Sequence, residues 1–195
     1  MSFTPTELVT DRLILRRWRR SDRAPYFAMH AEPEVAQFLL PPKSRAEANA
    51  QIDMFEACFK THGFGFWALE LIGATSETER FIGFTGLFAP SFEAHFVPCV
   101  EVGWRLARPF WGRGYATEAA RAAMADGFDR LGLDEIVAMT SALNARSQAV
   151  MARLGMNRDP ADDFEHPRVA EGDPLRPHVL YRISREAFDE ALKPA

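Results

Sequence analysis

Apolar residues gather in several short runs along the chain, and such runs are typical of β-strands. The first run covers residues 10–16, where polar residues flank the apolar segment Leu13-Ile14-Leu15, as expected for a half-buried first strand. Further strands are predicted at residues 66–71, 81–88, 97–106, 136–140 and 179–183. Segments rich in Gly, Ser, Thr and Pro separate the second, third and fourth runs, which favours an antiparallel meander.

Other segments repeat their apolar positions at helical spacing. Ser21 or Asp22 is placed to cap a helix that runs to about residue 30, with a second short helix after it. Ser44 and Glu47 form a capping-box pattern, so a helix is predicted from there to the glycines at 63 and 65. Three more helices are predicted at residues 116–131, 144–154 and 185–192. The pattern indicates a mixed α/β domain, with helices packed on a largely antiparallel sheet.

Composition narrows the class of protein. The length of 195 residues suits one domain covering residues 1–195, and 47% apolar residues is ordinary for a globular chain. The net charge of −4 argues against bulk nucleic-acid binding. No apolar run approaches the roughly 18–20 residues of a membrane helix, and no secretory leader is visible, so a cytoplasmic location without membrane contact is expected. The two cysteines stand alone, which predicts no metal site.

A glycine-containing segment lies where a predicted strand gives way to the alanine-rich helix: Trp111-Gly112-Arg113-Gly114-Tyr115-Ala116-Thr117. Its two glycines permit unusual backbone angles and a close approach of a ligand to the main chain. The first turn of the following helix offers unpaired N–H groups and the positive end of the helix dipole, both suited to phosphate. The alternative is an ordinary glycine turn before a core helix.

Two common nucleotide-binding motifs do not match this segment. The P-loop pattern GxxxxGK[ST] is absent. The dinucleotide pattern GxGxxG meets Thr117 in place of its third glycine, and the acids at 134 and 135 precede the next strand instead of following it. A nicotinamide cofactor is therefore not expected.

A second segment of interest runs from residue 144 to residue 156. Asn144 stands where a helix cap belongs, and Ser147 lies one turn further along the same side. These two residues form either a ligand-binding pair or simply a cap followed by a surface serine.

Taken together, several segments resemble the GCN5-related N-acetyltransferases (GNAT), most closely the branch of ribosomal-protein-alanine and similar Nα-acetyltransferases. The resemblance is carried by residues 12–16, 101–106, 111–119, 144–147 and 153–156, in the family's order, and covers roughly residues 8–183. Two positions depart from common members: Trp111 replaces a Gln or Arg, and Met151 replaces a tyrosine that acts as general acid. The resemblance implies a mixed, largely antiparallel sheet of six or seven strands, splayed between the fourth and fifth.

The resemblance also implies acetyl-CoA as cofactor, bound in the splay without a metal. Backbone groups of Trp104, Arg105 and Leu106 would pair with the pantetheine arm. The pyrophosphate would be held by Trp111, Gly112, Arg113, Gly114, Tyr115, Ala116 and Thr117. Asn144 and Ser147 would lie near the thioester.

The implied reaction is direct attack of an amine on the thioester, with a fourth-strand N–H stabilising the oxyanion. Glu101 is the candidate base or water relay, although it could simply be hydrogen-bonded to neighbouring backbone. Ser147 is the candidate proton donor to the departing thiolate.

The acceptor is predicted to be a primary amine, either a protein N-terminus or a small molecule. Phe92, His95 and His166 are candidate acceptor contacts, although packing also explains them. The alternative function is a non-catalytic acyl-CoA-binding or sensing module. Either a monomer or a homodimer is compatible with the sequence.

Overall fold

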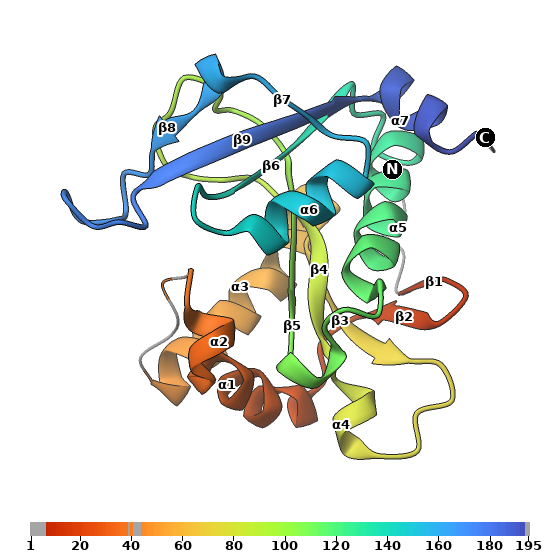
Figure 1. Cartoon of the computed structure of the whole chain (residues 1–195). Coiled ribbons are helices and arrows are strands. Elements are labelled where there is room, and N and C mark those ends of the chain that lie inside the picture. Colours follow the sequence, from red (N-terminus) through yellow and green to blue (C-terminus); the bar gives the residue numbers. More distant parts are fainter. Residues whose placement is uncertain (1–6, 39, 41–43, 194–195) are drawn as a thin grey trace.

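The computed structural model describes residues 7–38, 40 and 44–193. Within this part of the chain, nine strands form one sheet in the order β1-β2-β3-β4-β5-β6-β9-β7, and β8 also pairs with β9 (Figure 1). The strands are β1 (Glu7–Val9), β2 (Leu13–Arg16), β3 (Phe66–Leu71), β4 (Gly83–Phe88), β5 (Glu101–Leu106), β6 (Glu135–Ser141), β7 (Asn157–Arg158), β8 (Phe164–Glu165) and β9 (Pro177–Ser184). All the pairings are antiparallel except that of β5 with β6.

The predicted fold class is therefore confirmed, including the meander from β2 to β5. All six predicted strands are present. The sheet has more strands than the six or seven expected because it includes β1, β7 and β8, which are two or three residues long. Runs this short carry too few positions to show an alternating pattern.

Seven α-helices flank the sheet in the described residues: α1 (Arg23–Ala31), α2 (Pro33–Ala36), α3 (Arg45–His62), α4 (Glu77–Arg80), α5 (Tyr115–Asp129), α6 (Ala145–Arg153) and α7 (Arg185–Ala191). The start of α3 is as predicted, since the Ser44 hydroxyl accepts a hydrogen bond from the Glu47 N–H at 3.1 Å. Its end is also as predicted, with Gly63 in the left-handed conformation. The short helix α4 was not predicted.

The start of α1 differs from the prediction. Residues Arg20–Asp22 form a turn of 3₁₀-helix, and α1 begins at Arg23 with no side-chain cap. The buried carboxylate of Asp22 instead accepts hydrogen bonds from Arg16, at 2.8 and 2.9 Å, and from the Arg19 N–H at 2.6 Å. A buried guanidinium competes more strongly for this carboxylate than the helix end does.

The core has a layer on each face of the sheet, as the side chains of β3 show. Phe66 and Ala68 pack against α1–α3, whereas Trp67 and Leu69 pack in the cluster that contains Ala119 and Ala123 of α5. The small alanine side chains allow α5 to lie close to the strands.

The sheet is continuous at only one point between β5 and β6. Glu101 pairs with Val137, and the Val137 N–H donates to the Val100 carbonyl at 2.9 Å. Beyond this point β6 and β9 slant away from β5, and α6 lies beside the opening (Figure 1). This arrangement agrees with the predicted splay and positions the candidate site. None of the helices in the described ranges has the length and apolar character needed to cross a membrane.

Candidate active site

A cavity of about 790 Å³ opens where β5 and β6 separate. Residues of β5, the start of α5, the start of α6 and the α1–α3 layer line it. Among the predicted site residues, those that line the cavity are Glu101, Trp104, Arg105, Leu106, Trp111, Gly112, Gly114, Tyr115, Ala116, Thr117, Asn144 and Ser147. The structure thus brings together two segments that the sequence had suggested separately.

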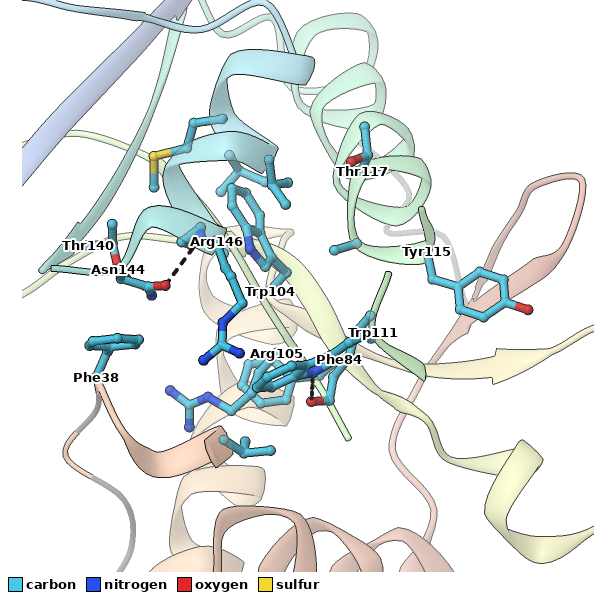
Figure 2. Close-up of a pocket in the computed structure, with 18 of the residues that line it drawn as sticks. Phe38, Phe84, Trp104, Arg105, Trp111, Tyr115, Thr117, Thr140, Asn144 and Arg146 are labelled. Atoms are coloured by element: carbon cyan, nitrogen blue, oxygen red, sulfur yellow. Dashed lines mark hydrogen bonds between the residues drawn. The ribbon is translucent and has the colours of Figure 1, made fainter. Parts of the chain in front are cut away.

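The turn before α5 has the backbone that phosphate binding requires. Gly112 and Gly114 adopt φ angles of 73° and 81°, which side chains rarely tolerate. A Cβ atom at Gly112 would meet nothing within 4 Å, so the main chain is open on that side. The first turn of α5 also carries N–H groups without intrahelical partners. The Tyr115 side chain points away from the cavity (Figure 2), so it offers only its backbone. These groups fit a diphosphate.

Contacts from the β1–β2 turn hold this segment in place. The Glu118 carboxylate accepts hydrogen bonds from the Thr10 hydroxyl at 2.6 Å, the Arg12 N–H at 3.0 Å and Arg12 Nε at 2.7 Å. Burial raises the pKa of Glu118, but these hydrogen bonds lower it by more. The net pKa is therefore below its usual value, and the carboxyl is ionised. Arg12 Nη1 also donates to the Arg113 carbonyl at 3.0 Å. Arg113 does not line the cavity, and its guanidinium lies 6.0 Å from the centre of the Phe110 ring.

Asn144 caps α6 at the cavity wall. Its Oδ1 accepts from the Ser147 N–H at 3.2 Å, and its Nδ2 donates to Thr140 Oγ1 at 3.0 Å (Figure 2). The capping role is thus present, and the same geometry leaves both Asn144 and Ser147 on the cavity lining. A cap and a ligand contact are compatible at this position.

Glu101 lies at the junction of β5 and β6, paired with Phe88 on one side and Val137 on the other. Among the described residues its carboxyl has no hydrogen-bond partner. Burial raises its pKa to about 7, and the charge of Arg168 lowers it by less. A carboxyl that titrates near neutral pH is suited to accepting a proton in a reaction at that pH.

Two cationic side chains lie over the Trp111 ring. Arg146 and Arg108 lie 4.5 and 5.1 Å from its centre, and the indole N–H donates to the Leu106 carbonyl at 2.7 Å. Arg105 and Arg146 both point into the cavity beside this ring (Figure 2).

The predicted acceptor contacts Phe92, His95 and His166 do not line the cavity. Phe92 and His166 pack together, with ring centres 4.8 Å apart, in a cluster around β8 and β9. His95 Nε2 lies 3.3 Å from Asp162 Oδ1. Burial, with the nearby charges of His178 and Arg168, lowers the pKa of His166 to about 4, so it is neutral near pH 7. Contact between these residues and an acceptor stays a prediction.

The sequence interpretation missed the wall formed by the α1–α3 layer. Tyr26, Phe38, Gln51 and Met54 line the cavity from this side. Their positions along the chain show only helix periodicity and core character. Tertiary packing brings these residues to β5, so no local sequence motif could have revealed their place in the site.

Comparison with known proteins identifies the family. Residues 12–157 match the sequence profile of the acetyltransferase (GNAT) domain. The chain therefore belongs to the GNAT acetyltransferase family and is an enzyme that transfers acyl groups.

Individual relatives agree with this assignment. The Bacillus subtilis protein YkkB, which is uncharacterised, is 30% identical over 153 residues, covering 78% of this chain and 86% of that protein. The crystal structure of an acetyltransferase from Agrobacterium tumefaciens is similar with a TM-score of 0.71 and 28% identity, covering 95% of this chain and 98% of that one.

The narrower branch is less well supported. A Vibrio cholerae structure named for ribosomal-protein-serine acetylation is similar with a TM-score of 0.70 but only 20% identity, covering 93% of this chain and 99% of that one. At this identity the similarity shows the fold alone.

In the described ranges, no three His, Cys, Asp or Glu side chains gather as a metal site would require.

Proposed function

We propose that the protein is an acetyl-CoA-dependent N-acetyltransferase that acts on a primary amine. The observation that carries this proposal is the cavity at the splay, which joins an open glycine turn at the α5 N-terminus to a carboxyl with a pKa near neutrality. The glycine turn suits a diphosphate, and the carboxyl suits an attacking amine. Family membership favours an enzyme over a non-catalytic acyl-CoA-binding module.

In this proposal the N–H groups of Gly112 to Thr117 hold the pyrophosphate, and the backbone of Trp104 to Leu106 orients the pantetheine arm. Acetyl-CoA supplies the acetyl group as an activated thioester. Glu101 accepts the proton that the amine loses as the C–N bond forms, directly or through a water molecule. A β5 N–H stabilises the oxyanion, and the Ser147 hydroxyl donates a proton to the sulfur as the C–S bond breaks.

The test is a thiol-release assay with acetyl-CoA and a panel of amines and peptides. The wild-type protein should release CoA only when an amine is present, with an equal amount of N-acetylated product seen by mass spectrometry. Glu101→Gln should lower kcat by about 100-fold or more, because general-base catalysis typically contributes 10²–10⁴-fold. Ser147→Ala should have a smaller effect, since a thiolate leaves readily.

Glu77→Gln provides the matched control, because Glu77 is an exposed carboxylate of α4 that does not line the cavity. It should retain wild-type activity. Release of CoA that is independent of every amine, or the absence of turnover with the whole panel, contradicts the proposed function.

A further inference from the structure

Arg105 is a cation that faces the cavity without an anionic partner in the described part of the chain. Its Nη1 donates to Nε2 of His30, and its guanidinium lies 5.4 Å from the centre of the Phe84 ring. No described side chain or carbonyl accepts from its remaining N–H groups. Burial lowers the pKa of Arg105 to about 10, so it stays protonated at neutral pH.

The neighbours of Arg105 are neutral at that pH. His30 Nε2 accepts from an arginine, so the proton of the ring is on Nδ1, which donates to the Tyr26 carbonyl at 2.7 Å. Burial and the charge of Arg105 lower the pKa of His30 to about 4. Burial raises the pKa of the Tyr26 phenol to about 12. Neither group balances the charge of Arg105, and uncompensated buried charge is costly.

A second guanidinium reaches the same space. Arg146 projects from α6 and stacks on Trp111, and its Nη2 donates to Gln37 Oε1, a neutral acceptor, at 3.2 Å. Arg105, Arg146 and Trp111 line the same cavity, and Figure 2 shows both arginine side chains pointing into it. Glu34 also lines the cavity, but it is paired with Arg108 at 2.8 Å.

Arg105 lies away from the turn that is expected to hold the pyrophosphate. Side chains alternate along a strand, so Arg105 shares a face of β5 with Gly103 and Glu101. Trp104 and Leu106 face the other way, toward clusters that contain residues of α5. Arg105 therefore lies on the α1–α3 side of the sheet, away from the α5 layer. On its own side, Glu101 is four residues away, or roughly 13 Å between Cα atoms.

We propose that the acceptor is a primary amine that also carries an oxyanion, such as a carboxylate. This inference rests on the proposed function. Arg105, together with Arg146, binds the oxyanion, while the amine faces Glu101. Paired guanidinium groups suit this role because their planar N–H groups match carboxylate and phosphate oxygens.

The experiment compares acids with their amides: glycine with glycinamide, β-alanine with β-alaninamide and longer ω-amino acids with their amides. Because the amide lowers the pKa of the amine, each kcat/KM is expressed per neutral amine. Aminomethylphosphonate distinguishes phosphonate from carboxylate. The wild-type protein should favour the acids by about 10- to 100-fold in kcat/KM, the size expected for a charge-assisted hydrogen bond. Arg105→Gln should bring the ratio of the acid and amide kcat/KM values, measured within that variant, close to one, and Arg146→Gln should reduce this ratio.

Arg108→Gln is the matched control, because Arg108 also lies over Trp111 but pairs with Glu34 and does not line the cavity. It should keep the preference. If Arg105→Gln fails to fold, Arg105→Lys provides a second variant. It retains the charge and should keep part of the preference. Equal use of acids and amides by the wild-type protein overturns the inference while leaving the proposed function intact.

A measurement without turnover separates the two proposals. Binding of N-acetylglycine and N-acetylglycinamide to the CoA-loaded protein is measured by calorimetry. Tighter binding of the acid that is lost in Arg105→Gln supports the oxyanion site even if no amine is acetylated. If Arg105→Gln instead weakens CoA binding as strongly as acid binding, the arginine serves the cofactor and the inference is wrong.

Discussion

Glu101 places an ionisable group at the only paired position between β5 and β6. Desolvation raises its pKa from 4.5 to about 7, so the carboxyl holds its proton more tightly in the folded protein than in the unfolded chain. Between these two pH values the folded state binds more protons, and stability therefore falls as the pH rises. The raised pKa of Glu101 thus lowers the stability of the fold at neutral pH.

Glu101→Gln should make the protein more stable at pH 8, because the amide resembles the protonated carboxyl and carries no charge. The pKa shift corresponds to a gain on the order of 3 kcal/mol in the free energy of unfolding, and the difference should shrink toward pH 5. Denaturant unfolding at a series of pH values measures it. An equal or lower stability of Glu101→Gln at pH 8 would show that the carboxylate is stabilised in the fold and that its pKa is not raised.

The pH dependence of the rate provides a companion test of the same group. With an acceptor amine that stays neutral across the range, kcat/KM should rise with pH through about 7 as Glu101 loses its proton. Glu101→Gln should show no such rise. A wild-type profile that is flat across this range would contradict the role of Glu101 as base.

At the scale of elements, the N-terminus of α5 depends on a contact that is distant in sequence. Glu118 in the first turn of α5 is held by Thr10 and Arg12 of the β1–β2 turn. The glycine motif that begins α5 was recognisable from the sequence because all its residues are local. The residues that hold this motif in place could not be recognised from the sequence, because they lie more than a hundred positions away.

Arg12→Gln should weaken CoA binding about 3- to 10-fold, because the turn loses a charge-assisted hydrogen bond to Glu118 and the donor to the Arg113 carbonyl. Arg19→Gln is the matched control. Arg19 pairs with Glu70, and its side chain is exposed to a similar extent, at 54% against 47% for Arg12. Calorimetry with CoA compares the two variants. The same dissociation constant in both would mean that the β1–β2 turn does not position the binding segment.

At the scale of the whole molecule, patterns within single elements were predictable and contacts between layers were not. β3 was predicted with its observed ends because a short run rich in apolar and aromatic residues lies there between segments that contain glycine. The two segments that line the cavity from α5 and α6 were also predicted. The acceptor contacts predicted at Phe92, His95 and His166 lie outside the cavity lining, whereas α1–α3 form one of its walls. The place of α1–α3 is fixed by side-chain packing, such as the contact of His30 with Arg105.

The central claim is that CoA binds at the splay with its diphosphate against the main chain before α5. The most direct test is calorimetric titration of CoA into the wild-type protein and two glycine variants. Gly112 and Gly132 have similar φ angles of 73° and 69°, and a Cβ at either would meet nothing within 4 Å. Substitution by valine therefore strains both alike, but only Gly112 lines the cavity. Gly112→Val should abolish measurable binding while Gly132→Val retains it. Equal binding by both variants, or no heat with the wild-type protein, would contradict the claim.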